Sequence, residues 1–147
     1  SIDLAKSGEL QNRFQLVSAL LQESELPGRN YDFIYAYSIF THLPETHILH
    51  NLDVLCAALR PGGKMILTVR EPKFLDYLKN NERKVSAVND FLEATGYWFG
   101  NAQNSEYGDT VITSEWIKNN LEGLGEISTL GHIGTEPYQT IMTITPG

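Results

Sequence analysis

Apolar positions gather in two short runs that lie on either side of a helical pattern. The runs Tyr31–Phe40 and Lys64–Val69 are rich in aromatic and β-branched residues, as in strands buried in a parallel sheet. Between them, apolar residues recur at three- and four-residue spacing, which is the pattern of a helix face packed against a sheet. These residues are Ile48, Leu52, Leu55 and Leu59. The pattern predicts two adjacent parallel strands in the centre of one sheet, joined by that helix.

Turn and capping residues mark the ends of these elements. Pro44 and Glu45 suit the first turn of the helix, where a missing amide proton costs nothing and an acid faces the positive end of the dipole. The run Pro61-Gly62-Gly63 is expected to end the helix and to allow the reversal into the second strand.

The second half of the chain alternates helical segments with a segment that lacks a period. Pro72–Gly96 has helical periodicity, whereas Tyr97–Asp109 is aromatic and polar without a period. Together they predict a helical and aromatic insertion over residues 72–109. Ser114–Leu121 predicts a short helix, capped by Thr113 or by its own first residue.

The end of the chain predicts a strand pair. Glu126–Leu130 and Tyr138–Thr145 are joined by a glycine-containing turn and are expected to pair antiparallel. Residues 1–30 are less periodic, and they end in a clear turn. The whole pattern predicts a single α/β domain over residues 1–147.

The composition argues against several classes of protein. The chain has 18 acidic and 11 basic residues, and its net charge of −7 argues against a nucleic-acid binder, which needs clustered basic residues. No run approaches the roughly 20 apolar residues of a membrane span, and no signal peptide is evident. The single cysteine, Cys56, cannot form an internal disulfide, so a cytoplasmic location is expected. No cysteine–histidine or acidic constellation predicts a metal site.

Three short motifs follow one another in the central region. They are Tyr31-Asp32 at the start of the first strand, Ser38 to His42-Leu43 in the turn after it, and Pro61-Gly62-Gly63 before the second strand. This order resembles the second half of the Rossmann-like class I S-adenosylmethionine-dependent methyltransferases. The resemblance implies a doubly wound, mostly parallel sheet with an antiparallel last strand. The family's glycine-rich loop has no counterpart in this sequence, so the fold is expected to be amino-terminally incomplete.

The resemblance also implies an activity and a cofactor. The reaction would be transfer of a methyl group from S-adenosyl-L-methionine to an oxygen or nitrogen of a small molecule, such as a sugar or other secondary metabolite. The positions that match the family's cofactor contacts are Asp3 for the ribose, Glu23 and Ser24 for the adenine, and Ala36, Tyr37 and Ser38 for the methionine part. The expected partner is a small-molecule acceptor, and neither nucleic acid nor membrane.

His42 is the candidate catalytic residue. It follows the first strand at the carboxyl edge, where open parallel sheets bind ligands. An imidazole there could accept a proton from a hydroxyl or amine acceptor. The alternative is a histidine that caps or orients the loop. If His42 acts in transfer and not in folding, His42→Ala should change stability by no more than about 1 kcal/mol.

Aromatic residues of the insertion are candidate contacts for the acceptor. Tyr97, Trp98 and Tyr107 could present ring faces to a sugar or aromatic molecule. His132, near the last hairpin, is a further candidate. The alternative is that these rings anchor the insertion on the core.

Two other functions remain open. A nicotinamide-dependent oxidoreductase would share the sheet, but none of these segments supplies the Gly-x-Gly-x-x-Gly fingerprint. A non-catalytic methyltransferase-like module, which binds or scaffolds a partner, would also lack the glycine-rich loop. The encoding gene separates these cases, since an upstream strand followed by Gly-x-Gly would indicate an enzyme.

Overall fold

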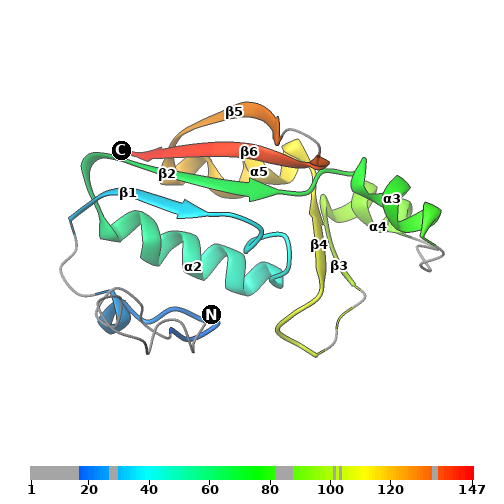
Figure 1. Ribbon diagram of the computed structural model, residues 1–147, viewed down its shortest axis with the longest axis horizontal. Helices are drawn as coiled ribbons and strands as arrows, with labels where there is room; N and C mark the ends of the chain where they lie inside the picture. The colour runs from blue at the N-terminus through cyan, green and yellow to red at the C-terminus, as the bar shows by residue number, and fades with distance from the viewer. Residues whose placement is uncertain (1–16, 27–29, 82–87, 101, 103, 134–135) are drawn as a thin grey trace, which may run out of the picture.

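Four strands form one mixed sheet, which is accompanied by helices and a separate hairpin (Figure 1). The computed structural model describes residues 17–26, 30–81, 88–100, 102, 104–133 and 136–147. Across the sheet the order is β1 (Tyr31–Ala36), β2 (Leu59–Val69), β6 (Glu136–Pro146) and β5 (Gly125–Ile133). The short turns η2 (Glu23–Glu25) and η3 (Glu122–Leu124) precede β1 and β5. No helix of the part that the structure describes is long and apolar enough to span a membrane.

The two apolar runs form adjacent parallel strands, as their sequence predicts. Tyr35 of β1 lies beside Ile66 of β2 in parallel register, and helix α2 (Glu45–Ala58) connects the strands. β6 is antiparallel to β2, with Met142 opposite Leu67, and it is also antiparallel to β5. The predicted α/β class and the antiparallel last strand are therefore confirmed. Within the four strands described for this sheet, one pair is parallel and two pairs are antiparallel, so the described sheet is mixed, and a doubly wound, mostly parallel sheet stays a prediction.

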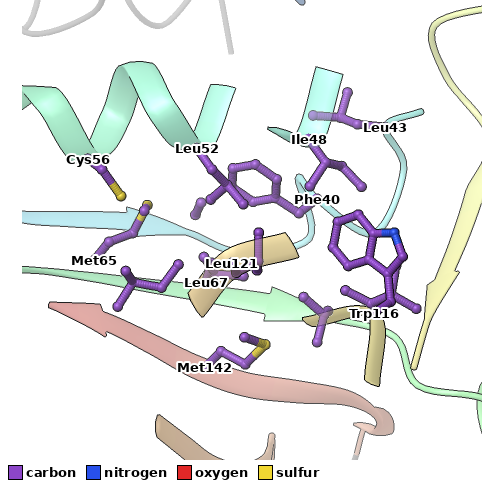
Figure 2. Packing of buried hydrophobic residues seen from close by; sticks show 14 of the residues in the cluster. Phe40, Leu43, Ile48, Leu52, Cys56, Met65, Leu67, Trp116, Leu121 and Met142 are labelled. Atoms are coloured by element: carbon purple, nitrogen blue, oxygen red, sulfur yellow. The ribbon is translucent and has the colours of Figure 1, made fainter. Parts of the chain in front are cut away.

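One continuous core lies between the sheet and helices α2 and α5 (Ser114–Leu121). Leu52 of α2 and Leu121 of α5 are each 1% exposed. Figure 2 shows how side chains from both helices meet those of β2 and β6. The residues of β2 and β6 in this cluster are Leu59, Met65, Leu67, Val69, Met142 and Ile144.

Cys56 and Thr113 each have a structural role at these helices. Cys56 is buried in the same core, and burial raises the pKa of its thiol to about 11. The group therefore remains a protonated thiol near neutral pH. Helix α5 begins where its capping residue predicts, because the backbone N–H of Trp116 donates to Oγ1 of Thr113 at 3.1 Å.

β1 is shorter and more exposed than its apolar sequence predicts. It ends at Ala36, and the chain turns at Ser38, whose φ is 55°. On the face opposite the core, Phe33 and Tyr35 are 51% and 61% exposed. β1 is the edge strand of the described sheet, so its predicted place in the centre was wrong for this part of the chain.

β2 is longer than predicted, because Pro61-Gly62-Gly63 belongs to it. The strand begins at Leu59, directly after α2, and its register with β1 shifts between Tyr31 and Phe33. A Cβ atom on Gly63 would lie 2.9 Å from the carbonyl oxygen of Tyr31. The glycine therefore permits a close approach of two backbones at an irregular strand start, and the motif is not a separate turn.

Two short helices and a hairpin lie between β2 and α5. Helices α3 (Phe74–Asn80) and α4 (Val88–Thr95) confirm the helical pattern after Pro72. Strands β3 (Tyr97–Gly100) and β4 (Asp109–Ile112) pair antiparallel, whereas the sequence predicted no regular structure there. A second core holds these elements together; its buried residues are Phe74, Leu75, Leu78, Val88, Leu92 and Val111.

Candidate functional site

The carboxyl ends of β1 and β2 meet the start of β6 and the β3–β4 hairpin at one edge of the sheet (Figure 1). Residues 37–43 leave β1, cross this edge and enter α2. One set of polar contacts joins this loop to β2 and β6, and a second set joins it to the hairpin. Open parallel sheets bind their ligands beyond the carboxyl ends of the strands, so this edge is the candidate site.

Ser38 has a left-handed backbone conformation and forms hydrogen bonds with two buried side chains. Its backbone N–H donates to Oγ1 of Thr68 at 2.9 Å, and its Oγ accepts from Nε2 of Gln139 at 3.3 Å. The hydroxyl of Thr68 donates to Oε1 of Gln139 at 2.7 Å. A non-glycine residue with positive φ is strained, and such strain is concentrated at functional sites.

An apolar pocket of about 440 Å³ opens beside this loop. Ala36, Ile39 and Phe40 line it from the end of β1, and residues 17–19 with Leu21 line it from the preceding segment. Tyr37 and Ile39 are 43% and 51% exposed. The loop therefore presents apolar and aromatic surface around the polar Ser38.

His42 is fixed by three neighbours. Its Nδ1 lies 2.7 Å from the carbonyl oxygen of Gly108, and since a carbonyl only accepts, Nδ1 carries the proton. Its Nε2 lies 3.4 Å from Nη2 of Arg70, which donates. The ring stacks on Tyr107 with 4.8 Å between the centroids and 11° between the planes. Nε2, the basic nitrogen of this tautomer, thus faces a cation.

The environment lowers the pKa of His42. Burial of the imidazole is the largest cause, and the positive charge of Arg70 adds to it. The hydrogen bond to Gly108 and the negative charge of Asp109 act in the opposite direction. The net effect keeps the ring neutral near pH 7.

Arg70 and Asp109 form a nearly buried ion pair beside His42. Nη1 of Arg70 lies 2.9 Å from Oδ1 of Asp109, and the two side chains are 11% and 10% exposed. The same nitrogen donates to the carbonyl oxygen of Thr41 at 3.1 Å, and the guanidinium lies 4.1 Å from the ring centroid of Phe74. Arg70 therefore connects the end of β2 to the loop, to the hairpin and to α3.

Backbone hydrogen bonds attach the hairpin directly to the loop. The N–H of Gly108 donates to the carbonyl oxygen of His42 at 3.0 Å, and the N–H of Thr110 donates to that of Thr41 at 2.9 Å. The hydroxyl of Thr110 donates to the carbonyl oxygen of Leu43. The insertion and the loop after β1 are therefore joined by a continuous series of hydrogen bonds.

The structure separates the four aromatic and histidine candidates for acceptor binding. Tyr107 is 45% exposed and stacks on His42 at the edge. Tyr97 instead accepts from the backbone N–H of Glu45 at 2.7 Å, and burial raises its pKa to about 12. Trp98 packs against the second core. His132 lies on β5 with Nδ1 3.4 Å from Oγ1 of Thr140.

The residues proposed to contact the adenine lie in the turn η2, which precedes β1. Glu23 and Ser24 lie exposed in η2, on a segment that Asn51 attaches to α2. Oδ1 of Asn51 accepts from the N–H of Leu21 at 2.9 Å, and its Nδ2 donates to the carbonyl oxygen of Ala19 at 2.9 Å. Asp3 lies outside the described residues.

Four polar residues of this edge escaped the sequence prediction: Thr68, Arg70, Asp109 and Gln139. Arg70 directly follows the predicted strand Lys64–Val69, and Asp109 is the last residue of the segment Tyr97–Asp109. Opposite charges at the ends of these two segments could have indicated an ion pair between them. Thr68 lies inside β2 and Gln139 inside β6, where a buried polar residue has no periodic signature. Only the pairing of the strands reveals that they meet.

No family model and no curated protein matches the sequence. Solved structures are nevertheless similar to it. An S-adenosylmethionine-dependent methyltransferase from Methanosarcina mazei is similar with a TM-score of 0.57 and 13% identity, over 99% of this chain and 76% of its own. An O-methyltransferase family protein from Burkholderia thailandensis has a TM-score of 0.56 and 11% identity, over 95% of this chain and 37% of its own.

The chain corresponds to only part of several of these structures. The complex of DhpI with SAH has a TM-score of 0.48 and 16% identity, over 84% of this chain and 52% of its own. The chain therefore spans about half the length of DhpI. The chain has the fold of the Methanosarcina mazei and Burkholderia thailandensis proteins, whose TM-scores are higher.

Proposed function

We propose that this chain, which has the fold of the S-adenosylmethionine-dependent methyltransferases, acts in transfer of a methyl group from S-adenosyl-L-methionine to an oxygen or nitrogen of a small molecule. The observation that carries the proposal is the strand order β1-β2-β6-β5, with β1 and β2 parallel and β6 antiparallel between β2 and β5. The similarity to the Methanosarcina mazei methyltransferase, which covers 99% of this chain, supports the same proposal.

The cofactor is proposed to bind over Ala36, Tyr37 and Ser38. The apolar pocket beside the loop offers room for a flat or thioether-bearing group, and the Ser38 hydroxyl offers a hydrogen bond. Contacts of Asp3 with the ribose and of Glu23 and Ser24 with the adenine remain part of the proposal. So does a doubly wound, mostly parallel sheet, for which the parallel β1–β2 pair is the supporting observation.

The acceptor is proposed to bind against the exposed ring of Tyr107, within the insertion of residues 72–109. Tyr107 and His42 form a stacked pair at the edge, so a ring or a sugar could extend the stack. Tyr97, Trp98 and His132 have partners elsewhere, and they could affect the acceptor only through the hairpin or the end of the sheet.

Methyl transfer from a sulfonium places modest demands on acid–base chemistry. Because the leaving thioether is neutral, alignment of the acceptor atom, the methyl carbon and the sulfur supplies much of the rate. His42 could accept the acceptor's proton at Nε2 once the contact with Arg70 opens, since the ring is already neutral. With the contact closed, the same residue orients the loop and the hairpin.

Titration calorimetry tests the proposal. We expect S-adenosylhomocysteine to bind to this chain or to the complete gene product, and NAD⁺ not to bind. Transfer of a radiolabelled methyl group to a panel of hydroxyl and amine acceptors then separates an enzyme from a non-catalytic module. Binding of NAD⁺ in preference to S-adenosylhomocysteine would overturn the proposal.

A further inference from the structure

The conformation of Ser38 requires support from outside its own loop. Its φ of 55° is unfavourable for a residue with a Cβ atom. The neighbouring side chains of Tyr37 and Ile39 are largely exposed, so they hold the turn only weakly. The support comes from Thr68 and Gln139, which are 1% and 4% exposed.

Ser38, Thr68 and Gln139 are joined by a closed ring of three hydrogen bonds, in which each residue donates to the next. The N–H of Ser38 donates to Oγ1 of Thr68, whose single proton goes to Oε1 of Gln139. Nε2 of Gln139 returns a hydrogen bond to Oγ of Ser38. The Ser38 oxygen is therefore already an acceptor within the ring.

The direction of the ring decides what the Ser38 hydroxyl can offer a ligand. Because its oxygen accepts from Gln139, its proton remains available as a donor. Its oxygen also lies 3.4 Å from Oγ1 of Thr41, which is a long distance for a hydrogen bond between two hydroxyls. A carboxylate or hydroxyl of a ligand at this edge would be a stronger acceptor for that proton.

We propose that Thr68 and Gln139 are positioning residues, which hold Ser38 in its left-handed turn and orient its hydroxyl as a donor to the ligand of this edge. The role in ligand binding rests on the proposed function, and the ligand group addressed is a carboxylate or hydroxyl of the S-adenosyl compound. The role in holding the turn does not depend on that function. The two parts can therefore be tested separately.

A matched set of valine and serine variants tests the inference. Thr68→Val removes the hydroxyl from the ring, and Thr68→Ser retains it. Thr143→Val is the control, because Thr143 is also a buried threonine, 6% exposed, but lies outside the ring. It is on β6 opposite Ile66, which is two residues before Thr68 on β2. Gln139→Leu is a second route to breaking the ring if Thr68→Val does not fold.

Two measurements are made on each variant. Hydrogen exchange measures the exchange rate of the backbone N–H of Ser38, and calorimetry measures the affinity for S-adenosylhomocysteine. We expect Thr68→Val to accelerate exchange and to weaken binding, each by about tenfold or more, which corresponds to the loss of one hydrogen bond. Thr68→Ser and Thr143→Val should stay within about threefold of the wild type.

The outcomes separate the two claims. Equal exchange at Ser38 in Thr68→Val and Thr143→Val would overturn the positioning of the turn. Faster exchange with unchanged affinity would overturn the role of the hydroxyl in binding. If the wild-type protein binds no S-adenosylhomocysteine, the proposed function fails, and the exchange data alone still decide whether Thr68 and Gln139 hold the turn.

Discussion

The imidazole of His42 donates a hydrogen bond to the carbonyl oxygen of Gly108, 66 residues further along the chain, across 2.7 Å. This contact joins the loop after β1 to the hairpin of the insertion. The neutral ring, its stacking on Tyr107 and its contact with Arg70 all depend on the same placement. His42 is thus part of the structure of the edge whether or not it also moves a proton.

The first prediction concerns pH. The pKa of His42 in the folded protein is lowered, chiefly by burial. As the pH falls below about 6.5, the ordinary pKa of histidine, the unfolded chain therefore binds more protons at this position than the folded chain does. The stability contributed here is complete above that value and declines as the pH falls toward the folded pKa. We expect the melting temperature to fall more steeply between about pH 7.5 and about pH 5.5 for the wild type than for His42→Asn.

His42→Asn is a suitable control because its amide can donate to Gly108 but does not titrate. The measurement is thermal unfolding of both proteins at several pH values in one buffer series. Equal slopes would show that His42 does not contribute to the pH dependence.

The second prediction concerns removal of the His42 ring. The sequence alone predicts a stability change of no more than about 1 kcal/mol for the loss of this ring. The contacts with Gly108 and Tyr107 now lead us to expect a loss of about 1–2 kcal/mol for His42→Ala, measured by urea unfolding. A general base would in addition lower turnover by about a hundredfold or more. Unchanged turnover at saturating acceptor would remove His42 from the chemistry.

The third prediction compares two ion pairs. Asp109→Asn leaves the nearly buried Arg70 without its charged partner, and it should lower the free energy of unfolding by at least about 2 kcal/mol. Asp32→Asn is the matched control, since Asp32 and its partner Arg60 are 73% and 56% exposed. That change should cost less than about 0.5 kcal/mol. Similar losses in both variants would show that burial does not strengthen the first pair.

The fourth prediction separates two tyrosines of the insertion. Tyr97→Phe leaves the first backbone N–H of α2 without its acceptor, so it should cost about 1–2 kcal/mol of stability and leave the KM for the methyl acceptor unchanged. Tyr107→Leu removes a ring that is 45% exposed, so it should raise that KM and lower the free energy of unfolding by no more than about 1 kcal/mol, which is the loss of its stacking on His42. The reverse pattern would assign acceptor binding to Tyr97.

The fold could be predicted where a long periodic pattern and its caps agree. Helix α2 and helix α5 were found with nearly correct ends, because Pro44 and Thr113 mark their starts and the apolar residues repeat over several turns. The hairpin could not be found, because β3 and β4 each have only four residues and the loop between them is polar. The exposure of Ile39 could not be read from an apolar run either, since it depends on the turn at Ser38.

The candidate site could be predicted only in its local part. Ala36, Tyr37, Ser38 and His42 were chosen because they follow an apolar strand, and the structure does place them at one edge. Their partners lie far away in sequence, so no spacing rule relates Ser38 to Gln139 or His42 to Arg70. Whether the chosen residues hold a cofactor stays a prediction.

The ring around Ser38 also limits when the edge can form during synthesis of the chain. Gln139 follows Ser38 by 101 residues, and it lies at the start of the last strand, β6. Until the ribosome releases that strand and it docks between β2 and β5, the turn after β1 lacks half of its support. The nascent chain should therefore bury its α2 helix early but acquire a defined ligand edge only after β6 has been synthesised and has paired with β2.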